Sequence, residues 1–166
     1  MESYKKSVYF AFQMKNDLQV LLKDDWALLK LAQFQFNYSE KLCAHIIAET
    51  SEFDDPTLEH MEAYTARYAR LLDMYIQKIL KLLDRLEGYG DGTLRDVLNR
   101  CAKAGMILDA DKLMRWRIFR NEIAHDYLPT SQRTIFFEVK EISTELLESI
   151  ALTEDYIIRN GLINQL

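Results

Sequence analysis

The feature that most constrains the fold is a long apolar series between residues 58 and 86. Its members recur at steps of three and four residues: Leu58, Met61, Tyr64, Tyr68, Leu72, Tyr75, Ile79, Leu82 and Leu86. This spacing places one continuous apolar stripe along a single face of an α-helix. The series predicts a helix of about eight turns, which buries its stripe by packing lengthwise against other long helices.

The ends of this helix carry their own signals. Asp55 precedes Pro56, and an acidic N-cap before a proline at the first helical position is typical of a helix start. Three glycines, at positions 88, 90 and 92, predict the end of the helix, because glycine adopts the left-handed backbone of a helix terminus without strain.

The first fifty residues are also predicted to be helical, but in separate pieces. Residues 1–24 are amphipathic, and Asp24 or Asp25 is expected to cap a second helix. Residues 37–39 are expected to break that helix, with Ser39 capping residues 40–50. Whether residues 1–50 form two helices or three stays open at this stage.

Further helices follow the glycines. Thr93 and Asp96 have the spacing of a capping box with Asp in place of Glu, which predicts a short helix that Gly105 ends. Asp109 is expected to cap a helix of residues 110 to about 126.

Residues 128–130 are predicted to be a connector to the last helix. Thr130 or Ser131 is expected to cap this final long helix, which Gly161 ends.

Composition agrees with a helical protein. The chain has 24 Leu against 4 Val, and only 5 Gly and 2 Pro interrupt its 166 residues, which argues against a sandwich or barrel. We therefore predict an all-α fold, an up-down bundle of about five or six helices in a single domain over residues 1–166.

The apolar runs and the cysteines indicate the cellular compartment in which we expect the protein. The longest uninterrupted apolar run, residues 8–12, is shorter than the roughly 20 residues of a membrane span and the roughly 7 of a signal-peptide core. We expect a cytoplasmic protein without a membrane partner. Cys43 and Cys101 are expected to be reduced core residues, and their context lacks the spacing of a zinc site.

Charge is uneven along the chain. The formal net charge is −5, yet residues 93–120 hold 7 basic and 3 acidic residues, a local balance of +4. Such a segment favours a specific anionic ligand or an acidic partner surface. The alternative is a solvated helix face whose charges pair with acids elsewhere.

The stretch of residues 120–127, with the sequence RNEIAHDY, holds the residues best suited to chemistry. Arg120 is a permanent cation that can grip a phosphate, Asn121 adds a neutral donor, and His125 can transfer protons near neutral pH. These groups suit cleavage of RNA by its own 2′-hydroxyl, in which a base takes a proton and a cation stabilises the charge on phosphorus. Such a scheme needs no metal ion and no cofactor.

Helical geometry constrains this site. Arg120 and Tyr127 are seven residues apart and would share a face, whereas Arg120 and His125 would point about 140° apart on a regular helix. Either the last turn is unwound near residues 128 and 129, or two chains combine their residues. The second option favours a homodimer with a composite active site.

The same stretch resembles a known family. RNEIAHDY is similar to the R-x4-6-H motif of HEPN domains, and the tyrosine two residues after the histidine resembles the form found in HepT-type toxins. Residues 90–107 and the long-helix segment that starts at Arg67 also resemble the order of elements in that family. The resemblance covers roughly residues 55–150.

The resemblance implies a HEPN-like bundle, a homodimer and a metal-independent endoribonuclease toxin of a toxin–antitoxin pair. It assigns catalysis to Arg120 and His125, with Asn121 as the polar residue beside them. It also implies that a cognate nucleotidyltransferase antitoxin attaches AMP to Tyr127, using ATP and Mg²⁺, and so silences the toxin. Arg117 and Arg115, about one turn earlier, would then be candidate RNA contacts.

Another function is compatible with the same motif. Some relatives are described as substrate-binding subunits of nucleotidyltransferases and not as nucleases. The alternative is therefore a partner subunit of a minimal nucleotidyltransferase without nuclease activity.

Overall fold

The computed structural model describes the backbone of residues 2–47, 52–125 and 129–163, and the side chains of residues 13–47, 52–123 and 131–163. All regular structure in these ranges is helical. The elements are α1 (Glu2–Leu42), α2 (Asp55–Met74), η1 (Tyr75–Leu80), α3 (Lys81–Leu86), α4 (Leu94–Lys103), α5 (Ala110–His125) and α6 (Pro129–Arg159). Because α2, η1 and α3 follow one another without a break, they form one continuous helix.

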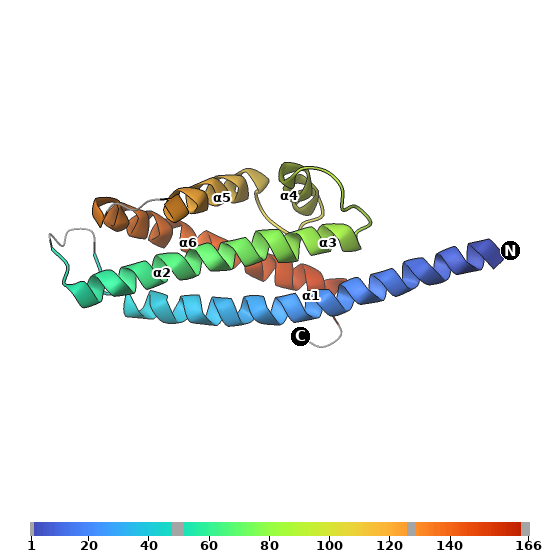
Figure 1. Ribbon diagram of the computed structural model, residues 1–166, viewed down its shortest axis with the longest axis horizontal. Helices are drawn as coiled ribbons and strands as arrows, with labels where there is room; N and C mark the ends of the chain where they lie inside the picture. Colours follow the sequence, from blue (N-terminus) through green and yellow to red (C-terminus); the bar gives the residue numbers. More distant parts are fainter. Residues whose placement is uncertain (1, 48–51, 126–128, 164–166) are drawn as a thin grey trace.

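The long helices alternate in direction, with the α2–α3 helix in the middle. Figure 1 shows α1 running against α2, while α5 runs back along it and α6 returns. The α2–α3 helix contacts α1, α4, α5 and α6, which confirms the all-α fold and the lengthwise packing predicted for this segment. In the described ranges, no helix combines the length and apolarity that crossing a bilayer requires.

The predicted apolar series lies in the core. Met61, Tyr64, Tyr68, Leu72, Tyr75, Ile79 and Leu82 are buried, while Leu58 and Leu86 at the two ends pack partly buried against them. Tyr64 donates a hydrogen bond to Ser143 Oγ of α6 at 3.1 Å, so this buried hydroxyl has a partner. The tyrosines of the series are therefore core residues.

The α2 helix begins one residue earlier than the sequence suggested. Its N-cap is Asp54, whose Oδ1 accepts a hydrogen bond from the Thr57 backbone N–H at 3.0 Å. Asp55 and Pro56 form the first turn. Two adjacent aspartates offered equivalent caps, and the extended backbone of Asp54 (φ −74°, ψ 162°) decides between them.

Glycine ends the α2–α3 helix as predicted. Gly88 has a φ of 90°, a left-handed conformation that residues with a Cβ rarely adopt. The Tyr89 N–H reaches back to the Asp84 carbonyl at 3.1 Å, and the Gly88 N–H reaches the Arg85 carbonyl at 3.0 Å. This is a Schellman termination, and Gly105 and Gly161 close α4 and α6 in the same way.

The prediction of separate helices in the first fifty residues is wrong, because α1 is one helix. Asp25 does not cap a helix start; its carboxylate accepts a hydrogen bond from Lys78 Nζ at 3.0 Å. Ser39 is buried, and its hydroxyl accepts a hydrogen bond from the Arg67 guanidinium. Both polar residues serve contacts between helices, which their local sequence does not reveal.

One π-helical segment interrupts the α-helical geometry of the central helix, and no expectation from the sequence covered it. Within η1, Tyr75, Ile76, Ile79 and Leu80 are all buried. A π-helical turn is wider than an α-helical one, so it shifts the register of the residues that follow it.

The later helix starts match the sequence in two cases of three. Thr93 and Asp96 form the predicted capping box, and Asp109 accepts backbone hydrogen bonds from residues 111 and 112. The helix α6 begins at Pro129, so the predicted connector is wrong for Pro129 and Thr130 and the predicted cap at Thr130 or Ser131 is too late. Proline suits the first helical position because its missing N–H needs no partner there. Leu128 lies outside the described residues.

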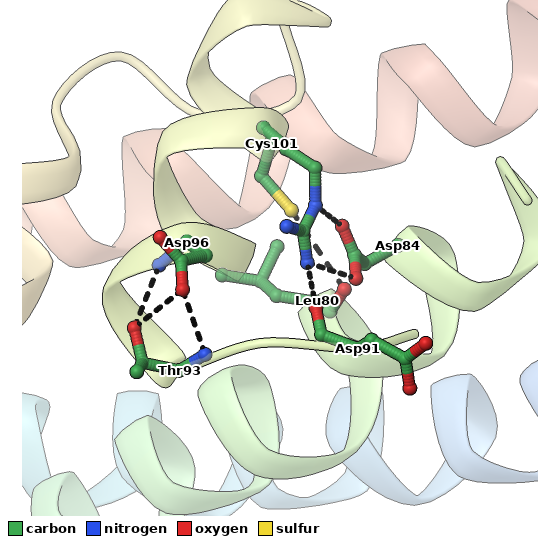
Figure 2. A network of polar contacts seen from close by, with 7 residues as sticks. Leu80, Asp84, Asp91, Thr93, Asp96 and Cys101 are labelled. Carbon is green, nitrogen blue, oxygen red and sulfur yellow. Dashed lines mark hydrogen bonds and ion pairs between the residues drawn. The ribbon is translucent and has the colours of Figure 1, made fainter. Parts of the chain in front are cut away.

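An ion pair between the partly exposed Arg100 and the buried Asp84 joins α4 to α3. Arg100 donates from Nε and Nη2 to the two carboxylate oxygens of Asp84 at 2.6 and 2.8 Å, and from Nη2 to the Asp91 carbonyl at 2.9 Å. Figure 2 shows Asp84 and Asp91 in this network, with Cys101 beside the Leu80 carbonyl. Cys101 and Cys43 are both buried free thiols, as predicted.

Candidate functional site

The α5 helix directs its apolar residues toward the core at regular steps. Ala110, Leu113 and Trp116 are buried and recur every three residues. The next position in this register is Arg120, four residues after Trp116. A guanidinium therefore continues a stripe that is otherwise apolar, and the Arg120 side chain is only 30% exposed.

A carboxylate from the central helix meets this guanidinium. Arg120 Nη2 forms an ion pair with Asp73 Oδ2 of α2, a side chain that is 35% exposed. Arg120 Nη1 also lies 3.5 Å from Asn121 Oδ1 and can donate a long hydrogen bond to it. The ion pair sets the direction of the guanidinium, because a carboxylate on a packed helix is a fixed acceptor.

Part of the guanidinium remains without a partner. Arg120 Nε is buried, and no acceptor among the described residues receives its hydrogen bond. A buried unsatisfied donor costs about 1–3 kcal/mol, so the packing of Arg120 carries an energetic penalty at Nε.

A buried polar network holds the segment that leads into α5. Tyr75 Oη lies 2.9 Å from Ser149 Oγ and 2.7 Å from Thr153 Oγ1 of α6. Thr153 Oγ1 in turn donates to the Met106 carbonyl at 2.8 Å, in the loop between α4 and α5. The π-helical segment, α6 and this loop are thereby connected, which orients the start of α5 and the stripe that ends at Arg120.

The other predicted site residues lie along the same helix. Asn121 and Arg115 are exposed and Arg117 is half-buried. His125 is the last residue of α5, but its side chain lies outside the described part of the structure. Tyr127 lies outside the described residues altogether, and so does its predicted place on the face of Arg120.

The backbone of α5 shows whether the helix is regular between Arg120 and His125. The helix α5 keeps α-helical geometry through His125, so it does not unwind between Arg120 and His125. At 100° per residue, the two Cβ atoms point about 140° apart around the axis. The unwinding expected near residues 128 and 129 falls partly on residues outside the described part of the structure, and a site shared between two chains stays a prediction.

The basic segment is largely neutralised by partners. Four of its seven cations form ion pairs: Arg95 with Asp111, Arg100 with Asp84, Lys112 with Glu145 and Arg120 with Asp73. Lys103, Arg115 and Arg117 have no ion pair within the described ranges. Ion pairs thus offset most of the local excess of positive charge. In the part of α5 whose side chains the structure describes, Arg115 and Arg117 are the cations near Arg120 that form no ion pair.

Asp73 is the site residue that sequence reasoning missed. It directly follows the buried Leu72, at the border of the stripe on α2. Two features of the sequence could have indicated this ion pair: an acidic residue at the edge of an apolar stripe, and an arginine in the core register of another helix. The sequence does not show, however, that α2 and α5 are in contact at these two residues.

Comparisons with known proteins add no further constraint. No protein-family model, no curated protein and no solved structure matches the chain. Over the described residues, three or more His, Cys, Asp or Glu side chains are nowhere grouped as a metal site would require.

Proposed function

We propose that this protein is a metal-independent endoribonuclease toxin of the HEPN type, paired with a nucleotidyltransferase antitoxin. The observation that carries the proposal is the placement of Arg120. It is a half-buried arginine held by Asp73, and it stands five residues before His125 in the sequence RNEIAHDY. A fixed cation and a residue that transfers protons are the groups that metal-free cleavage of RNA by its own 2′-hydroxyl uses.

The reaction uses a hydroxyl of the substrate itself. The RNA 2′-oxygen loses its proton and attacks the adjacent phosphorus, and the bond from phosphorus to the 5′-oxygen breaks. The 5′-oxygen gains a proton, so the products are a 2′,3′-cyclic phosphate and a 5′-hydroxyl. In this scheme His125 transfers a proton, and Arg120 stabilises the added charge on the phosphoryl oxygens.

Two chains would supply these groups together. Since Arg120 and His125 diverge by about 140° around one helix axis, we assign them to a composite site in a homodimer. In that arrangement Arg120 of one chain and His125 of its partner face the same phosphate. The free cations Arg115 and Arg117 would contact neighbouring phosphates of the RNA.

Tyr127 gives this site a means of control. In the proposed pair, the nucleotidyltransferase transfers AMP from ATP to the Tyr127 hydroxyl and releases pyrophosphate. The added nucleotide is bulky and anionic, so it would compete with the RNA phosphate for Arg120.

A second function is supported by the charge of the chain. The net charge is −5, and ion pairs occupy most cations of the basic segment. A modest attraction for RNA suits a helical subunit that presents Tyr127 or a substrate to a nucleotidyltransferase and cleaves nothing.

RNA cleavage by purified protein separates the two functions. The protein is made without any nucleotidyltransferase and incubated with bulk RNA in EDTA, beside His125→Ala and the matched control His45→Ala, which removes an exposed histidine far along the chain. The nuclease proposal expects cleavage by the wild type and by His45→Ala, and none by His125→Ala. Absence of cleavage by a wild type whose intact mass shows unmodified Tyr127 favours the partner-subunit function.

A further inference from the structure

The outward face of α1 exposes large apolar side chains. Val20 is 63% exposed, Leu31 54%, Phe34 70% and Tyr38 54%. The opposite face of the same helix packs Leu22, Trp26, Leu29 and Phe36 into the core. The helix α1 is therefore apolar on two sides, whereas a helix at the surface of a monomer is apolar on one.

The exposed residues follow the spacing of a coiled-coil seam. The seam residues, at alternating steps of four and three, are Val20, Asp24, Ala27, Leu31, Phe34, Tyr38 and Lys41. A seam with a repeat of 3.5 residues is the pattern that one helix presents to another along its length. Asp24 and Lys41 form no ion pair with any described residue, so both charges are available to a partner.

We infer that this seam pairs with the same seam of a second copy of this chain, in antiparallel orientation. The six seam residues from Asp24 to Lys41 are complementary to one another when facing residues have numbers that add up to 65, and Val20 then lies beyond the paired stretch, since α1 ends at Leu42. Asp24 then faces Lys41, Ala27 faces Tyr38 and Leu31 faces Phe34, and the twofold axis repeats each pair. Each contact joins opposite charges, a small residue with a large one, or two apolar residues.

Other pairings of the same seam are worse. A parallel pairing in register places Asp24 against Asp24 and Lys41 against Lys41, and like charges in contact are unfavourable. An antiparallel pairing shifted by one heptad faces Phe34 with Asp24 in one direction and Leu31 with Lys41 in the other. Charge and size therefore select one register.

This contact is separate from the proposed active site. Figure 1 shows α1 and α5 on opposite sides of the α2 helix, so pairing through α1 leaves Arg120 uncovered. The inference does not depend on the proposed nuclease function. A chain that also forms a composite site through α5 would use two different twofold contacts and assemble beyond a dimer.

Charge reversal tests the register. In sedimentation equilibrium, Asp24→Lys and Lys41→Asp should each raise the dissociation constant of this contact about tenfold or more, because two like-charge contacts replace two attractive ones. The double variant, or a mixture of the two single variants, should restore the wild-type assembly. The matched control Lys15→Asp changes an exposed lysine of α1 outside the paired stretch and should leave the assembly unchanged.

Cross-linking tests the orientation. Chains carrying Ala27→Cys and chains carrying Tyr38→Cys, with tags of different size, should form a mixed disulfide under mild oxidation. Efficient self-linking of Ala27→Cys would indicate a parallel contact and overturn the inference, because the antiparallel register places the two copies of residue 27 eleven residues apart along the helices. Equal assembly of the wild type and a folded Phe34→Glu variant, verified by circular dichroism, would overturn it as well.

Discussion

Asp73 of α2 forms an ion pair with Arg120 of α5. The arginine of RNEIAHDY is therefore oriented by the long central helix and not only by its own segment. Since α2 also packs against α1 and α6, the position of this guanidinium depends on the core of the bundle.

The first prediction concerns this pair. Replacing Asp73 with Asn should reduce the rate of RNA cleavage by about tenfold, because a charge-assisted hydrogen bond that positions Arg120 is replaced by a weaker neutral one. The free energy of unfolding should change by less than about 1 kcal/mol, since the pair is partly exposed to solvent. Single-turnover cleavage and urea unfolding measure the two effects.

Glu122→Gln is the matched control for that variant. It removes an exposed acidic residue of α5 that contacts no described partner. A similar loss of cleavage in both variants would show that the net charge of the surface matters and that the Asp73–Arg120 contact does not.

The second prediction concerns the ion pair between α3 and α4. Arg100→Ala leaves the buried Asp84 carboxylate without its cation, and such a loss costs about 3–5 kcal/mol. Urea unfolding should show this decrease in the free energy of unfolding. Arg95→Ala, which breaks the exposed pair with Asp111, should cost less than about 1 kcal/mol. Equal effects would contradict the burial of Asp84.

The third prediction concerns alkaline pH. Burial raises the pKa of Tyr64 to about 12 and raises the pKa values of Tyr68 and Tyr75 as well, while an exposed tyrosine titrates near 10. The folded state thus keeps protons that the unfolded state loses. The free energy of unfolding should be constant with respect to these groups below about pH 10 and fall as the pH rises above it.

Urea midpoints at about pH 8 and about pH 10.5 check this prediction. The wild type should lose stability between the two values, and Tyr64→Phe should lose less, since one of the perturbed hydroxyls is gone. A tyrosinate absorbance that reaches its full amplitude before unfolding begins would contradict the account.

The fourth prediction concerns the thiols. Burial raises the pKa of Cys101 to about 12 and raises that of Cys43, so little thiolate exists in the folded protein near neutral pH. Neither cysteine should react with a thiol reagent under native conditions, and both should react in urea. Rapid modification of the folded protein at either residue would show that its burial is incomplete.

The elements that could be predicted have strong local causes. The apolar series of the α2–α3 helix defines the buried face of that helix. The glycines at positions 88, 105 and 161 end their helices through their backbone conformation. The Thr93–Asp96 capping box is equally local. Each of these features can be recognised from its own segment of the sequence, without knowing how the helices pack.

What was missed depends on contacts between helices. Asp25 and Ser39 resemble caps in sequence, but α1 continues through both, and their side chains bind Lys78 and Arg67 of the central helix instead. The same applies to Asp73, whose importance appears only when α2 and α5 are packed together. The π-helical turn also lies in the core, with Tyr75, Ile76, Ile79 and Leu80 buried, and the three- and four-residue spacing of the apolar series did not distinguish it from an α-helix.

The most direct test of the proposed function compares two substrates. An RNA oligonucleotide and its 2′-O-methyl counterpart are incubated in EDTA with the wild type, Arg120→Ala and the control Arg159→Ala, which removes an exposed arginine at the end of α6. The account predicts that the wild type cleaves only the RNA and leaves a 2′,3′-cyclic phosphate, that Arg159→Ala retains cleavage, and that Arg120→Ala abolishes it. Equal cleavage of both substrates, or undiminished activity in a folded Arg120→Ala variant, would contradict it.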